Sequence, residues 1–415
     1  MDPGSATERC PEDMGPSLHL QTRTVDFSPN VAALKPSATL ALAARAKELK
    51  RKGIPVVDLS AGEPAYGTPP YAAEAGIEAI RAGHTGYPPT PGLLLLREAI
   101  ASYLVETTRA DEVDPLSVMV SAGVKQALFN CAYVLFGSDD EVLVPAPFWP
   151  SYPSIIELAG ARPVIVETTW EDGFQLFPEA LEEMRTPRTR GLMINSPSNP
   201  TGAVYDHDTL QAIARWCDEH GIWLFSDEIY RRLAYGGEAP SAFDVEALPE
   251  RTVLFDGVSK AFCMPGWRIG FVAGPRELIA KASDLQSQTT SGAVHPAQYA
   301  AAAALSQPEI REEWVAALTS RLAGLRVQGL ELLSGLPGVE VFPPAGAIYL
   351  FVRLQEAIEG KTTSLEVAEG LLQDSQVACI PGEPLGSPGY LRFNFAVEEE
   401  VLDEGLNRVR AFFAP

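Results

Sequence analysis

Residues 191–226 of the chain, which read GLMINSPSNPTGAVYDHDTLQAIARWCDEHGIWLFS, decide the fold class. A short apolar run, Gly191–Asn195, is followed by a helical pattern over Asp206–His220 and by a second apolar run, Ile222–Ser226. Short apolar runs that alternate with longer helical patterns are typical of parallel sheets with helical connections. The stretch therefore predicts one strand–helix–strand unit of an α/β fold.

The same alternation continues on both sides of this unit. Helices are predicted between the strands, for example over Gly123–Phe136 and Pro178–Met184. Seven strands within about 160 residues predict one large, doubly wound domain with a mostly parallel seven-stranded sheet. The five strands outside the central unit are predicted at Ser117–Ser121, Glu141–Pro145, Arg162–Glu167, Thr252–Asp256 and Ile269–Ala273.

The pattern changes after Gly292, where long Ala/Leu-rich helices and separate strands replace the alternation. Such a change predicts a second, smaller α+β domain. Its elements are a long helix over Pro296–Ser334, strands over Val339–Phe342, Ala347–Val352 and Gly389–Phe395, and a last helix over Glu398–Phe413.

The segment Ala33–Ser60 is expected to join the smaller domain, with a helix and a strand at Val56–Leu59, and Val31–Ala46 is predicted to be an amphipathic entry helix. We therefore expect a tail at residues 1–28, the smaller domain at residues 29–60 and 305–415, and the larger domain at residues 61–304.

The charge balance excludes several kinds of partner. The 415 residues include 32 Lys or Arg and 54 Asp or Glu, which gives a formal net charge of −22. So acidic a chain is not expected to bind nucleic acid or an anionic membrane. No apolar run approaches the ~20 residues that span a bilayer. Five cysteines without a C-x-x-C motif predict neither a disulfide scaffold nor a zinc ribbon, and a cytoplasmic location fits them best.

Candidate catalytic residues follow two of the predicted strands. The stretch from Asp256 to Gly270 places Lys260 just after a strand, among small residues, and Arg268 eight positions later. Such a lysine suits a Schiff base, and such an arginine suits a phosphate, although a surface lysine in a loop is the plain alternative. Asp227 and Tyr230 close another strand, where a buried carboxylate would keep a pyridine nitrogen protonated. An Asp that caps a helix is the alternative there.

Three further strand ends carry polar or aromatic groups. Asn199 stands in the turn Asn195-Ser-Pro-Ser-Asn-Pro-Thr-Gly202, and Trp149 follows another strand, where it could stack on a flat ring or pack in the core. Gly123 opens a predicted helix whose free N–H groups favour an anion. Because these ends meet at one edge of the sheet, together they indicate a phosphorylated pyridine aldehyde, pyridoxal 5′-phosphate.

From about Val31 to its end, the chain resembles the fold-type I, class I aminotransferases, and among them the bacterial aspartate aminotransferases. Besides the motifs above, the matching stretches are Ala61-Gly-Glu-Pro64, Tyr87-Pro-Pro-Thr-Pro-Gly92 with Leu96-Arg-Glu98, and Tyr390-Leu-Arg-Phe-Asn394. The resemblance implies transfer of an amino group from aspartate or glutamate to a 2-oxo acid such as 2-oxoglutarate, in a ping-pong reaction with pyridoxal 5′-phosphate. It also implies a homodimer with shared active sites. No metal is expected, because the chain has only five histidines and no H-E-x-x-H motif.

The resemblance assigns a role to each matching residue. Lys260 would form the Schiff base and move the α-proton. The remaining cofactor contacts would be Asp227 at the ring nitrogen, Tyr230 and Asn199 at the phenolic oxygen, Trp149 on the ring, Arg268, Gly123, Val124, Lys125 and Ser259 at the phosphate, and Tyr87 at the phosphate of the neighbouring subunit.

The substrate would contact a second set of residues. Arg392 would bind the α-carboxylate, and Gly62, Trp149 and Asn199 would line the site. Lys125, with Ser37 and Thr39, would bind the distal carboxylate of a dicarboxylic substrate. The residue corresponding to Lys35 is associated with use of prephenate in some relatives, whereas a plain surface lysine is the alternative for it.

Two positions depart from the family pattern. Gly257 stands where many relatives have a hydroxyl residue, so one phosphate hydrogen bond is either missing or supplied by Ser259. Pro265 stands where Thr is frequent.

Other functions remain as alternatives at this point. An aminotransferase for aromatic or apolar amino acids, or a C–S lyase, would use the same scaffold, and Lys125 with Ser37 and Thr39 favours the dicarboxylate reaction over both. A non-catalytic regulator would need a DNA-binding domain, for which 28 N-terminal residues are too few. A Rossmann dehydrogenase and a serine hydrolase lack their G-x-G-x-x-G and G-x-S-x-G motifs.

Overall fold

The computed structural model describes residues 27–28, 31, 38–245 and 250–414, and of residues 38–43 and 358 it describes the backbone alone. Lys35, Ser37 and residues 1–26 of the expected tail therefore lie outside the described residues. No helix in the described part of the chain is long and apolar enough to cross a membrane.

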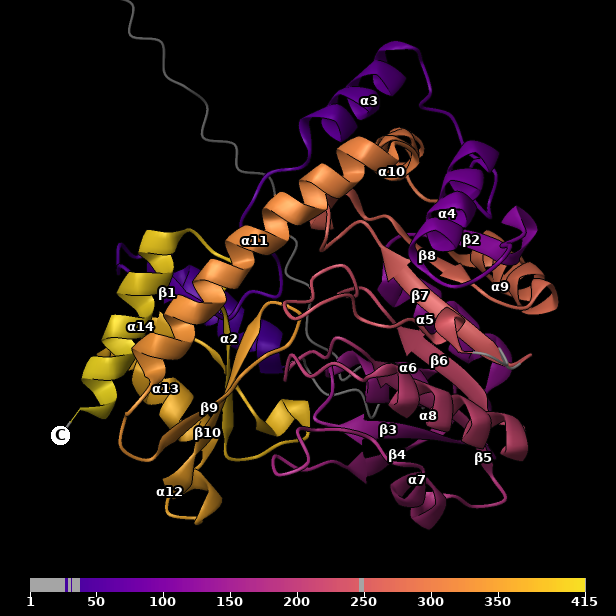
Figure 1. The fold of residues 1–415 in the computed structure, drawn as a ribbon. Helices are drawn as coiled ribbons and strands as arrows, with labels where there is room; N and C mark the ends of the chain where they lie inside the picture. The colour runs from indigo at the N-terminus through magenta and orange to yellow at the C-terminus, as the bar shows by residue number, and fades with distance from the viewer. Residues whose placement is uncertain (1–26, 29–30, 32–37, 246–249, 415) are drawn as a thin grey trace, which may run out of the picture. The chain divides into compact units, whose positions relative to one another are not determined.

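A seven-stranded sheet forms the centre of the larger part of the structure (Figure 1). The strand order is β2-β8-β7-β6-β5-β3-β4, and only β8 runs antiparallel to its two neighbours, so the predicted mostly parallel sheet is confirmed. The strands are β2 (Val118–Ser121), β3 (Glu141–Ala146), β4 (Arg162–Glu167), β5 (Thr189–Asn195), β6 (Trp223–Asp227), β7 (Thr252–Gly257) and β8 (Gly270–Ala273).

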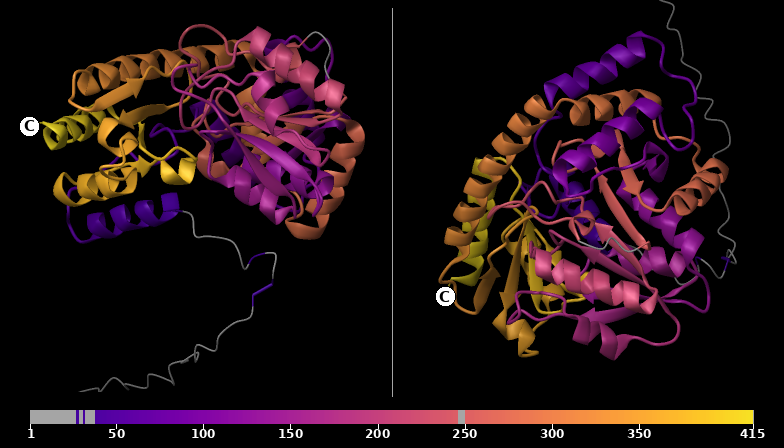
Figure 2. Two further views of the ribbon diagram at one scale, coloured as in Figure 1. Left: turned by 90° about the horizontal axis from the view of Figure 1, so that it is seen from below. Right: turned by 45° about the vertical axis from the view of Figure 1, so that its right-hand side comes forward.

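Both faces of this sheet are buried, as expected for parallel strands covered by helices. Along β3, Val142 and Val144 pack in a core with α5, whereas Leu143 between them packs in a second core with α8. Figure 2 shows helices on both sides of the strands. The helices of this larger part are α3 (Pro70–Arg81), α4 (Leu94–Thr107), α5 (Val124–Leu135), α6 (Ser151–Leu158), α7 (Pro178–Met184), α8 (His207–His220), α9 (Arg276–Thr289) and α10 (His295–Ser306).

The central strand–helix–strand unit forms as predicted, because its helix has clear end signals. The Asp206 carboxylate accepts a hydrogen bond of 2.7 Å from the Thr209 N–H and so caps α8. Gly221 ends the helix with φ of 64°, a conformation that glycine adopts without strain.

A second, antiparallel sheet follows in the C-terminal part, with the order β12-β13-β10-β9. The smaller part also contains a separate two-stranded parallel sheet, formed by β1 and β11. The strands are β1 (Val57–Asp58), β9 (Val339–Phe342), β10 (Tyr349–Leu354), β11 (Val377–Ala378), β12 (Ile380–Pro381) and β13 (Tyr390–Asn394). The helices are α2 (Ala38–Arg51), α11 (Pro308–Leu333), α12 (Gln355–Ile358), α13 (Ser364–Asp374) and α14 (Glu399–Phe413).

Several predicted boundaries differ from the structure by one or two residues, and three differences concern the smaller part of the chain. The single helix predicted over Pro296–Ser334 is wrong, because α10 ends at Ser306 and α11 begins at Pro308. Proline lacks the N–H that would continue a helix, and it disfavours helical backbone in the residue before it. Strand β10 starts at Tyr349 rather than Ala347, whose φ of 60° is incompatible with a strand. Helix α2 continues to Arg51, beyond the predicted end at Ala46.

The fold brings the predicted strand ends to one edge. Strands β2, β3, β5, β6 and β7 run in the same direction, so their carboxyl ends meet there. In open α/β sheets this edge is where ligands bind.

Candidate active site

A cavity of about 550 Å³ lies at this edge of the large sheet. It brings together side chains from five strand ends and from the second sheet. The predicted site residues that line it are Gly62, Val124, Lys125, Trp149, Asn199, Asp227, Tyr230, Ser259, Lys260, Arg268 and Arg392.

Lys260 is the nucleophilic group of the cavity. Its Nζ donates a hydrogen bond of 2.5 Å to the Gly62 carbonyl and lies 5.7 Å from the centre of the Tyr230 ring. Burial lowers the pKa of Lys260 to about 8, and the positive charge of Arg392 adds to the effect. Part of the amine is therefore neutral near pH 8, as a nucleophile or a general base requires.

Asp227 is a buried carboxylate at the end of β6. Its Oδ2 accepts a hydrogen bond of 2.8 Å from the Tyr152 hydroxyl, and its Oδ1 accepts one of 3.2 Å from the Ile229 N–H. Burial raises the pKa of Asp227 to about 6, although the bond from Tyr152 opposes this shift. A cationic ring nitrogen beside this carboxylate would favour its ionised form.

The beginning of α5 forms an anion cradle with Arg268. Among the described residues, the backbone N–H groups of Val124 and Lys125 have no hydrogen-bond acceptor and remain available to a ligand. Gly123 has φ of 87°, and a Cβ there would overlap the Arg268 guanidinium. The Arg268 side chain is held by the carbonyls of Pro265 (3.1 Å) and Ala122 (3.0 Å). A helix N-terminus with an arginine suits a phosphate.

Arg392 comes from β13 and reaches the cavity from the second sheet. Its Nη1 donates to the Asn199 amide oxygen at 2.9 Å and its Nη2 to the Ser60 carbonyl at 3.0 Å. Its Nε is buried and has no hydrogen-bond partner in the described part of the chain. An unsatisfied N–H on a buried guanidinium suits a carboxylate ligand.

Lys125 supplies a further cation. Its Nζ lies 4.7 Å from the centre of the Trp149 ring, and burial together with the charge of Arg268 lowers its pKa. The aromatic face stabilises the ammonium group inside the cavity.

Some predicted residues are not brought into the cavity. Tyr87 does not line it and is 96% exposed, so its role toward a neighbouring subunit stays a prediction. Gly123 acts through its contact with Arg268. Of Thr39 only the backbone is described, and Lys35 and Ser37 lie outside the described residues.

Sequence reasoning missed three residues that complete the site. Tyr152 stands one helical turn after Trp149, in the same aromatic stretch, and this spacing was an available signal. Asn195 ends β5, where its Nδ2 donates to the Asp227 carbonyl at 2.8 Å and its Oδ1 accepts from the Asn199 N–H at 2.7 Å. Tyr349 lies in a strand whose apolar pattern indicated only a core position.

The glycine at position 257 has a steric reason. A Cβ on Gly257 would lie 2.9 Å from both the Gly270 Cα and the Ile269 carbonyl oxygen, which is closer than real Cβ contacts. Strand β8 therefore approaches β7 too closely for a hydroxyl side chain. Ser259, which is buried and lines the cavity, is left as the candidate donor.

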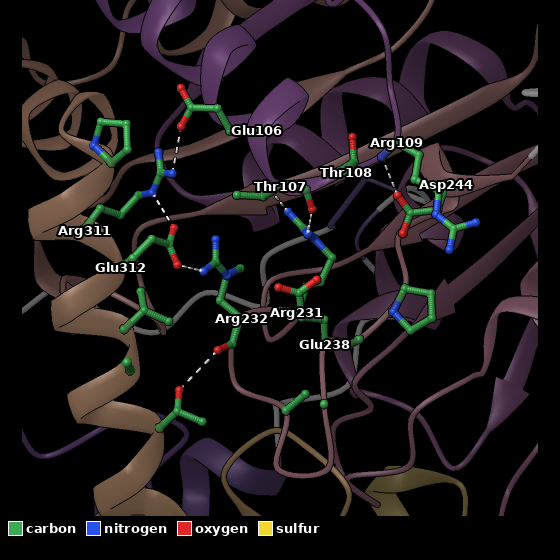
Figure 3. A pocket seen from close by; sticks show the side chains of 18 of the residues that line it. Glu106, Thr107, Thr108, Arg109, Arg231, Arg232, Glu238, Asp244, Arg311 and Glu312 are labelled. Carbon is green, nitrogen blue, oxygen red and sulfur yellow. Dashed lines mark hydrogen bonds and ion pairs between the residues drawn. The ribbon is translucent and has the colours of Figure 1, made fainter.

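A second cavity, of about 800 Å³, lies between α4, the segment after β6 and the first half of α11 (Figure 3). Its arginines are already used in contacts between these elements. Arg311 binds Glu106 (2.8 Å) and Glu312 (2.9 Å), Arg232 binds Glu312, and Arg231 donates to Thr107 Oγ1 at 2.9 Å. We interpret this cavity as part of a structural ion-pair network.

The residues of the first cavity fit pyridoxal 5′-phosphate. Asp227 suits the ring nitrogen, Trp149 a flat ring, Lys260 an aldehyde, and the N-terminus of α5 with Arg268 a phosphate. Arg392 lines the same cavity, and its guanidinium suits the carboxylate of a substrate. The fold and this donor set are those of a fold-type I transferase.

Comparison with known proteins agrees with this class of fold and site. The family model of the class I and II aminotransferases matches residues 54–409. The chain is 41% identical over 388 residues to the aspartate aminotransferase of Geobacillus stearothermophilus, which covers 92% of this chain and 97% of that protein. It is 40% identical over 382 residues to the aspartate/prephenate aminotransferase of Thermus thermophilus, which covers 92% of this chain and 97% of that protein.

The structures are similar too. The aspartate aminotransferase of Thermus thermophilus solved with maleate has a TM-score of 0.89 and 39% identity, over 93% of this chain and 99% of that one. The chain belongs to the class I and II aminotransferases, a family that uses pyridoxal 5′-phosphate. The predicted family and fold are thereby confirmed.

Proposed function

We propose that this protein is a pyridoxal-phosphate-dependent aspartate aminotransferase, which moves the amino group of aspartate or glutamate to a 2-oxo acid such as 2-oxoglutarate. The observation that carries the proposal is the presence of Arg392 and Lys125 in one cavity with Lys260. Two cationic side chains beside a lysine nucleophile suit a substrate that has two carboxylates and one amino group.

The cofactor would be held by the groups that fit it. These are Asp227 at the ring nitrogen, Tyr230 and Asn199 at the phenolic oxygen, and Trp149 against the ring. The phosphate would contact Arg268, Ser259 and the backbone at Gly123–Lys125. When bound, the cofactor supplies an aldehyde that condenses with amines and a protonated ring that withdraws electrons from the adjoining carbon.

The side chains of the chain itself would then bind the substrate and move the proton. Arg392 binds the α-carboxylate and thereby fixes the orientation of the Cα–H bond. The Lys260 amine, whose pKa is about 8, would take the proton from the substrate Cα and return it at the carbon that the cofactor aldehyde supplies. Asp227 stays ionised beside the ring cation, and its bonds from Tyr152 and Ile229 keep it in place.

For the substrate, Lys125 would bind the distal carboxylate, with Ser37 and Thr39 as further contacts. The relatives from Geobacillus stearothermophilus and Thermus thermophilus are named for aspartate and for aspartate and prephenate, which supports a dicarboxylic substrate. Prephenate, an oxo acid with two carboxylates, is therefore proposed as a further acceptor, with Lys35 as its additional contact.

For the assembly, we propose a homodimer in which Tyr87 of one subunit reaches the phosphate site of the other. The 96% exposure of this tyrosine supports the proposal, because a large aromatic side chain so exposed suits an interface. The two sheets support the division into a larger domain at residues 61–304 and a smaller one at residues 29–60 and 305–415.

The test begins with reduction of the yellow protein by borohydride, followed by peptide mapping. We expect the label on Lys260 alone, and none in Lys260→Ala. The surface variant Lys281→Ala should label like the wild type, because Lys281 is exposed. Aspartate and glutamate should then bleach the absorbance of the bound cofactor far more efficiently than leucine or phenylalanine. A colourless protein, or equal response to all four amino acids, would refute the proposal.

A further inference from the structure

Tyr349 lies between Tyr230, which follows a strand of the large sheet, and Arg392, which belongs to the second sheet. It is fully buried at the start of β10, and its hydroxyl oxygen lies 2.7 Å from that of Tyr230. The two rings meet edge to face, with centres 5.8 Å apart. On the Tyr349 ring lies the Arg392 guanidinium, 4.3 Å from the ring centre. One side chain therefore contacts both the proposed partner of the cofactor oxygen and the proposed partner of the substrate carboxylate.

The backbone fixes this position from two directions. Strand β10 pairs with β13, and Tyr349 is the register partner of Asn394, two residues after Arg392. The turn before β10 is bound to the segment after β6, because Ala347 N donates to the Leu233 carbonyl at 2.9 Å. The segment that carries Tyr230 and the strand that carries Tyr349 are thus tied together within a few residues of the hydroxyl pair.

The direction of the hydroxyl bond follows from the number of protons. A phenol has one proton to donate. On the proposed function, Tyr230 donates its proton to the phenolic oxygen of the cofactor, so it must accept from Tyr349. In such a chain, each hydrogen bond polarises the next and strengthens it. The Tyr349 hydroxyl would therefore strengthen the bond that Tyr230 makes.

We propose that Tyr349 is a positioning residue, whose hydroxyl strengthens hydrogen-bond donation by Tyr230 and whose ring holds the Arg392 guanidinium for the substrate carboxylate. The proposal rests on the proposed function and assigns two separable tasks to one side chain. A tyrosine that only fills the core would perform neither.

The hydroxyl is tested with Tyr349→Phe, which keeps the ring. The readout is the pH midpoint of the absorbance change of the bound cofactor, without substrate. A weaker bond from Tyr230 stabilises the anionic form of the cofactor oxygen less. The proton that titrates beside this oxygen is therefore lost only at a higher pH. We expect the midpoint to rise by roughly 0.3 to 1 pH unit.

The matched control is Tyr235→Phe. The Tyr235 hydroxyl donates to the Ala347 carbonyl, so this variant removes a hydroxyl between the same two segments without touching Tyr230 or Arg392. We expect its midpoint to equal that of the wild type. A midpoint in Tyr349→Phe that is unchanged, lowered, or matched by the control would overturn the role of the hydroxyl.

The ring is tested with maleate, a dicarboxylate that has no amino group to transfer. Tyr349→Phe should bind it within about twofold of the wild type, whereas Tyr349→Leu should bind it roughly 2- to 10-fold more weakly, because the guanidinium loses its aromatic support. Equal affinity in all three proteins would overturn the role of the ring. If Tyr349→Leu does not fold, Tyr349→Met replaces it in the same comparison, and the midpoint of Tyr349→Phe decides the role of the hydroxyl independently.

These outcomes are distinct from failure of the proposed function. A wild-type protein that takes up no pyridoxal phosphate contradicts both proposals. A wild-type protein whose absorbance titrates normally, with a Tyr349→Phe variant that titrates identically, contradicts only the role of Tyr349.

Discussion

At the scale of single residues, burial shifts the pKa values of the two ionisable groups on which the site depends. It lowers the pKa of Lys260 to about 8 and raises that of Asp227 to about 6. Both shifts favour the neutral form, because a charge loses its hydration when it is buried. In the protein without cofactor, a partner of opposite charge or a hydrogen bond would therefore stabilise the charged form of each group in place of the lost hydration.

The Asp227 carboxyl predicts a pH-dependent stability. Its pKa is raised above the ordinary value of about 3.9, so the folded protein without cofactor binds the proton more tightly than the unfolded chain. This contribution to stability is fully present below pH 4 and is lost as the pH rises to about 6. Asp227→Asn does not titrate, and it should gain about 3 kcal/mol relative to the wild type between pH 4 and pH 7.

Thermal unfolding of both proteins without cofactor, at several pH values, measures this difference. Parallel curves for the two proteins across this range would contradict the protonated state of Asp227.

Lys125 predicts a change in substrate preference. Lys125→Ala should raise KM for aspartate about 10- to 100-fold, because a charged hydrogen bond to the distal carboxylate is lost. KM for phenylalanine should change less than about threefold, because that substrate has no distal carboxylate. Steady-state kinetics with both amino acids give the comparison. Lys47, exposed at the rim of the same cavity, provides the control Lys47→Ala. Equal effects on the two substrates, or a larger effect in the control, would refute the assignment.

At the scale of elements, ion pairs fasten three segments that lie far apart in the sequence. Arg311 of α11 is 3% exposed and binds Glu106 at the end of α4, Glu312 beside it, and the Leu305 carbonyl at 2.8 Å (Figure 3). Through Glu312 the network reaches Arg232 in the segment after β6. Tyr230 lies in the same segment, two residues before Arg232, so the network supports a segment that lines the active site.

Arg311→Met tests this support. The variant leaves Glu106 without its cation, Glu312 with Arg232 alone, and the Leu305 carbonyl without the Arg311 donor, so the free energy of unfolding should fall by about 2 kcal/mol. The two glutamates are 37% and 46% exposed, which keeps the loss below that of a fully buried pair. Urea unfolding measures it. The control is Arg81→Met, whose 64% exposed side chain pairs with Glu74 and Glu78 and should cost less than about 0.5 kcal/mol. Equal losses would contradict the argument.

The elements show what the sequence can and cannot predict. Strands with a strong pattern, such as Arg162–Glu167, and helices with local end signals, such as α8, follow from short-range chemistry. The break at Pro308 was also readable, but the Ala/Leu-rich pattern on both sides concealed it. That β8 runs antiparallel between β2 and β7 depends on long-range packing, which no local pattern contains.

The residues of the active site likewise divide into those that the sequence pattern predicts and those that it does not. Lys260, Asp227 and Asn199 stand at strand ends of one sheet, so the predicted alternation alone brings them together. Tyr349 and Arg392 come from the other sheet, and the position of Tyr349 beside Tyr230 depends on how the two sheets are connected. The Arg392 role was available only through resemblance to a family, and the Tyr349 contact was not available at all.

At the scale of the whole molecule, the proposed dimer makes each active site depend on both subunits. Tyr87 lies in the segment before α4 and does not line the cavity of its own chain. Gly292 packs closely against this segment, because a Cβ there would lie 2.8 Å from Pro88. The Tyr87 side chain is 96% exposed on the packed segment, as a contact with a second copy would require.

A hybrid dimer tests this arrangement. Lys260→Ala should be inactive, and Tyr87→Ala should lose activity at limiting cofactor, because its phosphate contact is gone. In a dimer with one subunit of each kind, the Lys260 of the second variant meets the Tyr87 of the first, so one of two sites is complete. Co-expression with two different tags and purification over both should yield about half of the wild-type activity per dimer, because an isologous pair holds two equivalent sites. The purified wild type should sediment at about twice the 44.7 kDa chain mass. If Tyr87 acted within its own chain, the hybrid would contain one Tyr87→Ala site and one dead site, and its activity would not exceed half that of the Tyr87→Ala dimer.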